Sequence, residues 1–217
     1  MCRYCNSLRM NGNACNDCGS YTCFEPPPKY ELDYHAYRWS VFRPKFWLMW
    51  RKAWKCLPNK PSAVCDVGCG AQQALWWARI IGNYTVGWDI KGTPNNYVAH
   101  QFLTDSFGEF SQQYVRTFDV VWCWHTLEHS DNPIEFIDGL KQLLVNGGTL
   151  YLECPVAEYT EGNPEHFAFP EHRGVPSEKW IRSLLPNCIE EIPTEGRLLM
   201  MQYGNLNYHR RFVYHNK

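Results

Sequence analysis

The sequence of 217 residues lacks any apolar run that approaches the length of a membrane-spanning helix. Its N-terminus also lacks the basic and then apolar order that is typical of a secretory signal peptide. A net charge of −1 provides no overall attraction to nucleic acids or to acidic lipids. Internal repeats and low-complexity segments are absent as well. These absences predict one medium-sized globular domain with a small appendage and no membrane anchor.

Cysteine, in contrast, is abundant, with 11 residues in a chain whose hydrophobic fraction of 45% is enough for a full core. Such a count could indicate a secreted protein rich in disulfides. Several cysteines, however, occupy predicted core strands or a glycine turn, where free thiols behave as small hydrophobic side chains. These are Cys65, Cys69, Cys123 and Cys154. Without an export signal, we expect reduced thiols and a cytoplasmic location.

Four further cysteines form two Cys-x-x-Cys pairs, Cys2 with Cys5 and Cys15 with Cys18. Paired knuckles of this kind present four thiolates to a tetrahedral ion, which predicts a zinc site. A segment this short has no core of its own, so the metal would supply its folding energy. Because a closed four-cysteine site leaves no open coordination position, we expect the zinc to be structural. Two disulfides or a disordered thiol-rich tail are the alternative.

The segment 36–56 contains six basic residues and no acid, interleaved with aromatic residues. Phe46, Trp50 and Trp54 recur every four residues and therefore share one face of a predicted helix. The favoured interpretation is that this stripe packs on the domain while the basic face is solvated. The alternative is a lid or a nucleic-acid surface, where aromatic rings stack on bases and cations meet phosphates. Pro44 is expected to divide the segment into two helices.

From Pro61 onward, strand and helix patterns alternate along the chain, which predicts a doubly wound α/β sheet. Strands are expected near 63–68, 84–90, 97–103, 118–124 and 149–154. Helices are expected near 71–81, 107–114, 133–145 and 177–185. The last stretch, 188–215, reads as two further strands.

The first of these strands ends in Asp66 and the turn Gly68-Cys69-Gly70, and a helical pattern follows at once. Glycines at such a turn let the backbone bend sharply and approach a ligand, and the helix N-terminus favours polar or negative groups. The second strand ends in another acid, Asp89, which suits the hydroxyls of a ribose. Gly-x-Gly alone also marks ordinary tight turns, so the neighbouring segments decide the interpretation.

Together these segments resemble the class I S-adenosylmethionine-dependent methyltransferases, most clearly over residues 60–155. The resemblance implies a Rossmann-like, mostly parallel sheet with an antiparallel C-terminal hairpin. It implies an in-line methyl transfer, for which the protein mainly holds donor and acceptor close and aligned. The expected division is a zinc knuckle at 1–25, a linker with the basic aromatic segment at 26–58, and a methyltransferase domain at 59–217.

The family's pattern assigns S-adenosylmethionine to the ends of the first two strands. Gly68 and Gly70 would approach its methionine part, and Asp66 would orient that turn or the amino group. Asp89 would hold the ribose hydroxyls. The family often has a third glycine two residues after the second, where this chain has Gln72.

Three more cofactor contacts are implied by the resemblance. Asp105 would contact the adenine amino group, and Trp124 and His125 would lie beside the bound cofactor. An isolated acid can equally be a surface carboxylate or a helix cap. The acceptor stays open between a small metabolite, such as a sugar, and RNA. A degenerate, non-catalytic fold that acts as a binding module is the interpretation from a different class.

A weaker resemblance links the chain to the small-RNA 3′-terminal 2′-O-methyltransferases, in which a Glu-x-x-Glu-His cluster and a later histidine bind a divalent ion. It implies His125, Glu128, His129 and His166 as candidate catalytic residues, acting through a second divalent metal or as general bases. His125 replaces the first glutamate, which gives more nitrogen ligands than magnesium prefers. Alternatively, Glu128 and His129 only form hydrogen bonds at the rim of the site.

Overall fold

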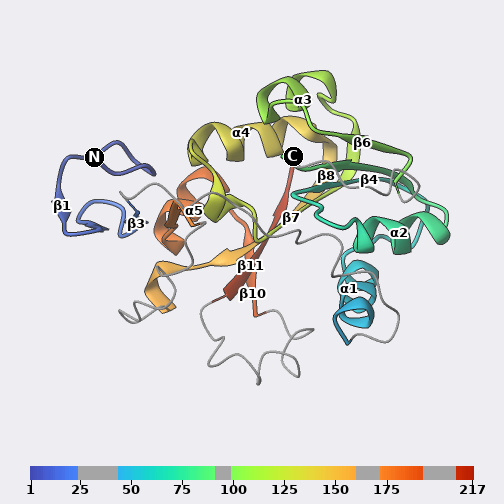
Figure 1. Ribbon diagram of the computed structural model, residues 1–217, viewed down its shortest axis with the longest axis horizontal. Helices are drawn as coiled ribbons and strands as arrows, with labels where there is room; N and C mark the ends of the chain where they lie inside the picture. The colour runs from blue at the N-terminus through green and yellow to red at the C-terminus, as the bar shows by residue number, and fades with distance from the viewer. Residues whose placement is uncertain (24–43, 91–98, 160–171, 193–208) are drawn as a thin grey trace.

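The computed structural model describes residues 1–23, 44–90, 99–159, 172–192 and 209–217. Its centre is a seven-stranded sheet (Figure 1). The strands are β4 (Ala63–Val67), β5 (Tyr84–Trp88), β6 (Gln101–Leu103), β7 (Phe118–Trp124), β8 (Leu144–Pro155), β10 (Ile189–Glu191) and β11 (His209–His215). They lie in the order β10-β11-β8-β7-β4-β5-β6. Strands β4 to β8 pair in parallel, whereas β11 runs antiparallel to both β8 and β10, which confirms the predicted C-terminal hairpin.

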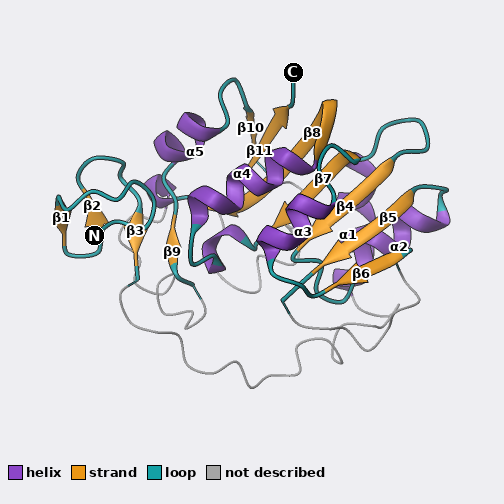
Figure 2. Ribbon diagram, turned by 90° about the horizontal axis from the view of Figure 1, so that it is seen from above, coloured by secondary structure: helices purple, strands orange, loops and turns teal. Residues whose placement is uncertain are grey.

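Helices cover both faces of this sheet (Figure 2). The helices are α1 (Pro44–Lys55), α2 (Gln73–Ile80), α3 (Phe107–Gln113), α4 (Pro133–Leu143) and α5 (Glu178–Leu184). Two single-turn 3-10 helices, η1 (Leu127–His129) and η2 (Ala157–Tyr159), follow β7 and β8. Local caps set the starts of α3 and α4 close to where the sequence predicts them. Ser106 and Glu109, for example, form a capping box in front of α3, and Pro133 occupies the first turn of α4.

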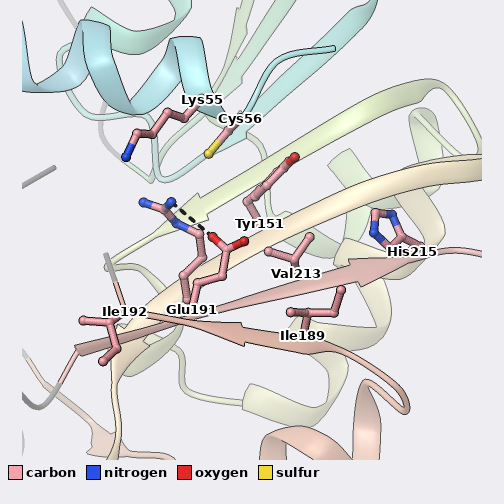
Figure 3. Close-up of a pocket in the computed structure, with 9 residues that line it drawn as sticks. Lys55, Cys56, Tyr151, Ile189, Glu191, Ile192, Val213 and His215 are labelled. Carbon is pink, nitrogen blue, oxygen red and sulfur yellow. Dashed lines mark ion pairs between the residues drawn. The ribbon is translucent and has the colours of Figure 1, made fainter. Parts of the chain in front are cut away.

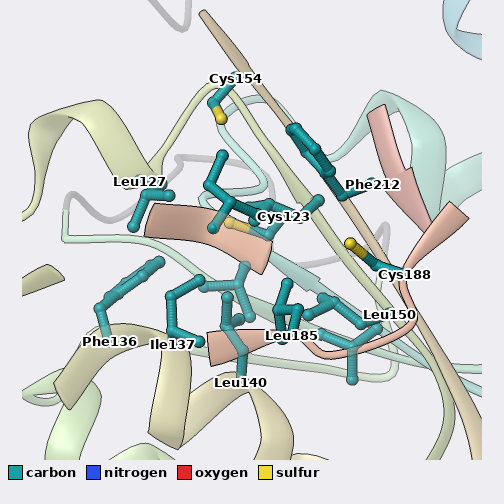
Figure 4. Close-up of a cluster of buried hydrophobic side chains, with 14 of the residues drawn as sticks. Cys123, Leu127, Phe136, Ile137, Leu140, Leu150, Cys154, Leu185, Cys188 and Phe212 are labelled. Atoms are coloured by element: carbon teal, nitrogen blue, oxygen red, sulfur yellow. The ribbon is translucent and has the colours of Figure 1, made fainter. Parts of the chain in front are cut away.

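The larger core lies between the sheet and α3, α4 and α5. Figure 4 shows Cys123, Leu150 and Phe212 of the sheet near Ile137 and Leu140 of α4, all of them buried. The opposite sheet face packs on α1 and α2 in a second cluster. Because both faces of the central strands are covered, these strands read as nearly continuous apolar runs rather than alternating ones.

Strand β8 begins earlier than expected, at Leu144 instead of near 149. Leu144 pairs with Phe118, and a register shift separates this pair from the rest of the β7–β8 ladder. The end of the chain supports the extension, because the Gly147 amide donates to the Asn216 carbonyl at 2.6 Å. A long-range pairing partner thus continues a strand through the Gly147-Gly148 sequence that, taken alone, indicates a turn.

The N-terminal module is joined to the domain by a second, small sheet. Strands β1 (Met10–Asn11), β2 (Ala14–Cys15), β3 (Tyr21–Thr22) and β9 (Gly174–Val175) lie in the order β1-β2-β3-β9. The contact continues at α5, where the rings of Tyr4 and Trp180 pack edge to face with centroids 4.8 Å apart. The module therefore lies against α5 at one end of the molecule, and α1 lies near the other end (Figure 1).

The orientation of α1 differs from the favoured prediction. The side chains of Trp50 and Trp54 are 38% and 60% exposed, whereas Lys52, Ala53 and Cys56 are buried. The reason is an ion pair, since Lys52 Nζ lies 2.8 Å from a carboxylate oxygen of the buried Glu153. The basic side chain of this pair therefore faces inward, and the tryptophans face outward. The segment 24–43 lies outside the described residues, and the side chain of Phe46 is not described either.

Candidate active site

The carboxyl ends of β4 and β5 meet at the Gly68-Cys69-Gly70 turn. The amides of Gly68 and Cys69 both donate to the Trp88 carbonyl, at 2.7 and 3.1 Å. Gly68 has a φ of +79°, and a Cβ there would lie 2.0 Å from Oγ1 of Thr126. Only glycine therefore fits at this position. A Cβ on Gly70 would meet no atom within 4 Å, so open space lies beside the second glycine.

Asp89 comes directly after β5 and its carboxylate reaches the same turn. The Gly70 amide donates to Asp89 Oδ2 at 2.8 Å. The structure thus brings together the acid predicted to hold the ribose and the turn predicted to approach the methionine part. Gln72, where the family often has glycine, has a φ of 58°, a left-handed conformation that glycine adopts most easily. Its side-chain oxygen accepts a hydrogen bond of 3.1 Å from the Ala99 amide.

Asp66 is buried on the inner side of this turn, with 3% of its surface exposed. Burial disfavours the carboxylate and raises the pKa of Asp66 to about 7; Lys52 opposes this shift and Asp89 adds to it. Near neutral pH this group can therefore carry a proton, unlike an ordinary surface aspartate.

Asp105 and Trp124 lie at the same edge of the sheet, on opposite sides of the turn. Asp105 follows β6 with an exposed side chain, and its backbone carbonyl accepts a hydrogen bond of 2.9 Å from Trp88 Nε1. Trp124 ends β7, where its ring stacks on Trp122 with centroids 4.8 Å apart. Lys52 Nζ lies 4.3 Å from the centroid of Trp124. The indole Nε1 of Trp124 is buried without a hydrogen-bond partner among the described residues.

His125 follows Trp124 in a left-handed backbone conformation with a φ of 56°. Such a conformation in a non-glycine residue is held by its surroundings, and the His125 amide donates to the Glu153 carbonyl at 2.8 Å. The ring lies between two carboxylates, with Nε2 3.1 Å from Glu153 and Nδ1 3.5 Å from Glu128. Burial disfavours the imidazolium, but the two carboxylates outweigh it and raise the pKa of His125. The raised pKa favours the imidazolium form and makes this ring a poorer proton acceptor.

Glu153 is a buried charged residue of this region that the sequence patterns did not single out. It lies in β8 with 2% of its surface exposed and accepts hydrogen bonds from Lys52, His125 and Arg211. Burial alone would raise the pKa of Glu153, but these three cations hold it well below the usual value. A glutamate inside a buried apolar strand is the signal that could have identified it, because buried charges need partners.

Glu128, His129 and His172 form a second polar group beside the first. One ligand atom of each residue lies within 4.8 Å of the others, and the rings of His129 and His172 pack edge to face with centroids 4.9 Å apart. Burial opposes the charge on Glu128, yet His125, His129 and His172 lower its pKa to about 2. Its Oε2 is buried without a partner among the described residues. One carboxylate and two imidazoles suit a transition metal or zinc better than magnesium.

His172 was not among the predicted residues, and no local pattern distinguishes it from other histidines. Its neighbour Arg173 connects it to both parts of the protein, because the Arg173 amide donates to the Glu128 carbonyl at 2.7 Å and its carbonyl accepts from Cys23 at 2.9 Å. His166, the histidine predicted for this role, lies outside the described residues.

The loop after β8 makes its described contacts away from this group. Among the described contacts, Glu158 accepts from the Glu178 amide at the start of α5, at 2.9 and 3.0 Å. Tyr159 bonds to Glu178 and to Glu190 of β10, and Arg210 stacks on its ring. These contacts direct Glu158 and Tyr159 toward α5 and the C-terminal hairpin.

The four cysteines of the N-terminal module converge as their spacing predicts. Their four Sγ atoms all lie within 4.8 Å of one another. The Sγ atoms of Cys2 and Cys18 are 3.6 Å apart, and those of Cys5 and Cys15 are 3.5 Å apart. Four thiolates on a tetrahedral zinc ion with bonds of about 2.3 Å are separated by roughly 3.8 Å. All four are free thiols. The residues therefore fit a zinc ion.

A pocket of about 730 Å³ lies elsewhere, on the sheet face beside the end of α1 (Figure 3). Figure 3 shows Lys55 and Cys56 on one side and Tyr151 with Val213 on the other. An ion pair of 3.6 Å between Arg211 and Glu191 lies in its wall. None of the residues that line this pocket belongs to the glycine turn.

None of the helices among the described residues has the length and apolar character of a membrane span.

Comparison with known proteins identifies related sequences. A methyltransferase domain family matches residues 39–188. The tRNA U34 carboxymethyltransferase of Colwellia psychrerythraea is 32% identical over 142 residues, which cover 58% of this chain and 43% of that protein. The chain spans about half the length, or less, of the curated relatives it matches.

Solved structures share the fold. A SAM-dependent methyltransferase from Archaeoglobus fulgidus has a TM-score of 0.62 at 13% identity and covers 80% of this chain and 95% of its own. Magnesium protoporphyrin IX methyltransferase from Synechocystis, solved with bound S-adenosylhomocysteine, has a TM-score of 0.53 at 19% identity, over 80% of this chain and 81% of its own. These similarities confirm the predicted sheet, and the family match over more than half of the sequence shows that this chain belongs to the methyltransferase domain family.

Proposed function

We propose that this chain transfers a methyl group from S-adenosylmethionine to an acceptor in RNA. The observation that carries the proposal is the hydrogen bond between the Gly70 amide and the Asp89 carboxylate. It joins the glycine turn and the acid at the carboxyl edge of two parallel strands, where ligands of open α/β sheets bind. RNA is favoured over a small metabolite because the curated relatives are named for tRNA.

The cofactor, when bound, supplies a methyl carbon already activated by its sulfonium. The chain's own task is then to position the reactants. Open space beside Gly70 receives the methionine part, and Asp89 holds the ribose. The Nε1 of Trp124, which has no hydrogen-bond partner within the described part of the chain, is available to a polar atom of the ligand. His129, rather than His125 with its raised pKa, accepts the acceptor's proton.

The first test is cofactor binding measured by calorimetry. Asp89→Ala removes hydrogen bonds to a charged group, each worth about 1.5 to 3 kcal/mol, so the affinity for S-adenosylmethionine should fall at least tenfold. Asp138→Ala, an exposed aspartate paired with Lys141 on α4, is the matched control and should bind normally. Unchanged affinity in Asp89→Ala would remove the ligand from this turn. Wild-type protein that binds no cofactor at all would instead indicate a degenerate fold.

The acceptor class is tested with labelled cofactor. Methyl transfer to total RNA should be abolished by prior ribonuclease treatment. Transfer to a metabolite pool, with none to RNA, would contradict the proposal and leave the fold assignment intact. The mass of the modified nucleoside also distinguishes a methyl group from the carboxymethyl group named in the curated relatives.

A second candidate is metal-assisted methylation of a ribose 2′-hydroxyl, which the Glu128–His129–His172 group favours. A divalent ion bound there would lower the pKa of the hydroxyl and fix its geometry. His172→Ala should then lower manganese or cobalt affinity and turnover together, whereas His215→Ala, at an exposed histidine of β11, should change neither. Turnover that survives both chelation and His172→Ala would contradict this candidate. It would leave His129 as the proton acceptor.

We also propose that Cys2, Cys5, Cys15 and Cys18 hold a structural zinc ion. The close sulfur atoms of this group support the proposal. The zinc knuckle would occupy 1–25, the basic aromatic segment would end near 58, and the methyltransferase domain would span 59–217.

A further inference from the structure

The outer face of α1 exposes three tryptophans in a row. Trp47, Trp50 and Trp54 are 50%, 38% and 60% exposed. They are separated by three and four positions, so they share one face of the helix. Large aromatic side chains are seldom left in solvent as a group, and exposed apolar patches of this kind mark interaction sites.

The rings form one continuous surface that extends onto α2. Trp50 lies 6.3 Å from Trp47 and 6.5 Å from Trp54, measured between ring centroids. The ring centroid of Trp77 in α2 lies 5.8 Å from that of Trp47 and 6.1 Å from that of Trp50. This packing holds the indoles in place, so a ligand would meet rings that are already ordered.

Positive charge is interleaved with these rings. Arg51 lies four residues after Trp47 and three before Trp54, so it shares their face, and it is exposed. Helix α1 contains no acidic residue along its whole length. A face that combines indoles with a cation is complementary to a ligand that combines flat rings with phosphates. In a helix that lies on a membrane, by contrast, the basic residues occupy the face opposite the aromatic ones.

The inner face of the same helix is part of the candidate active site. Lys52 reaches both Glu153 and the ring of Trp124, and α2, which α1 contacts, begins directly after the glycine turn. A strand bound along the outer face would therefore be separated from the candidate active site by the width of one helix, roughly 10 Å.

We propose that the tryptophan face of α1, formed by Trp47, Trp50, Arg51 and Trp54, binds a single-stranded segment of the RNA acceptor. The inference rests on the proposed RNA methylation and adds the form in which the substrate is recognised. A single strand is required because the bases of a duplex are stacked on each other and cannot offer their faces to the indoles.

The test measures binding of a fluorescein-labelled oligoadenylate to the full chain by anisotropy at several salt concentrations. The double variant Trp50→Ala/Trp54→Ala should bind at least tenfold more weakly, because each base that stacks on an aromatic ring adds affinity. Arg51→Gln should lower the slope of log affinity against log salt by about 1. Tyr84→Ala, which removes a ring exposed to 40% at the start of β5, should match the wild type. An unchanged affinity for S-adenosylhomocysteine confirms that each variant is folded.

Three results would overturn the proposal. The double variant could bind the oligoadenylate as tightly as the wild type, or Tyr84→Ala could lose as much affinity as the double variant. The wild type could also bind the oligoadenylate equally well when it is paired with oligouridylate. If the double variant loses binding to phosphatidylserine vesicles but keeps its affinity for the oligoadenylate, the face binds a membrane surface instead. Methylation of total RNA is measured in parallel. If the double variant keeps both RNA binding and methylation, only the surface proposal fails. A wild-type protein that neither binds nor methylates RNA contradicts the proposed function as well.

Discussion

Lys52 of α1 and Glu153 of β8 form an ion pair of 2.8 Å in which both side chains are more than nine-tenths buried. The pair connects the helix that carries the exposed tryptophans to β8, the strand whose Glu153 also contacts His125. Glu153 has further cationic partners, so its charge is compensated only while each of them stays in place. The contact therefore links the position of α1 to the electrostatics of the candidate active site.

We predict that Lys52→Met destabilises the protein by about 3 kcal/mol or more, because it leaves a buried carboxylate short of one partner. Urea unfolding of the full chain measures this loss. Lys60→Met, at an exposed lysine, should stay within about 0.5 kcal/mol of the wild type. The loss in the double variant Lys52→Met/Glu153→Gln should be smaller than the sum of the losses in the two single variants, because the two side chains interact directly. Strictly additive effects would show that the two side chains do not interact.

The two glycines of the turn should respond differently to alanine. Both have positive φ angles, +79° for Gly68 and +50° for Gly70, so each substitution costs about 1 to 2 kcal/mol of backbone strain. Only Gly68→Ala also drives a methyl group into Thr126, which adds roughly 1 to 3 kcal/mol. Gly68→Ala should therefore unfold at lower urea than Gly70→Ala. Gly70→Ala should retain more stability and still lose cofactor affinity, because its methyl group enters the open space. The opposite order of stability would contradict the packing of Thr126 against the turn.

Asp66 should make stability fall as pH rises. Its folded pKa of about 7 lies above its unfolded value of about 3.9, so between these values the folded state binds more protons than the unfolded state. The free energy of unfolding therefore decreases by up to about 1.4 kcal/mol per pH unit across this range. Between about pH 5 and 6.5, the slope of the free energy of unfolding against pH should be more negative in the wild type than in Asp66→Asn. Parallel curves for the two proteins would place the pKa of Asp66 near its ordinary value.

Purified protein should contain one zinc ion per chain on the four-cysteine group, measured by elemental analysis. Cys15→Ser should release the ion, whereas Cys23→Ser, whose thiol lies outside the group, should retain it. Because β3 pairs with β9 next to His172, release of zinc should also increase hydrogen exchange at residues 172–175. Full zinc retention in a chain that begins at residue 26 would place the metal elsewhere.

The sequence by itself determined those features that depend on residues close together in the chain. Apolar runs predicted β4, β5 and β7 to within two residues, and helical patterns predicted α3 and α5 to within one residue at each end. The Cys-x-x-Cys spacing predicted a cluster that does form. The family and the sheet were recognised from the glycine turn and the acids that end its neighbouring strands, since these signals come from strand ends that meet at one edge.

Only the tertiary structure decided which distant side chains meet. The four-residue period placed the tryptophans of α1 on one face, but the period says nothing about which face is buried. That choice was made by Glu153, about a hundred residues away, because an unpaired buried carboxylate costs more than exposed indoles. In the same way, His172 joins Glu128 and His129 where the Arg173 amide donates to the Glu128 carbonyl, a contact between segments distant in the sequence that no local pattern encodes.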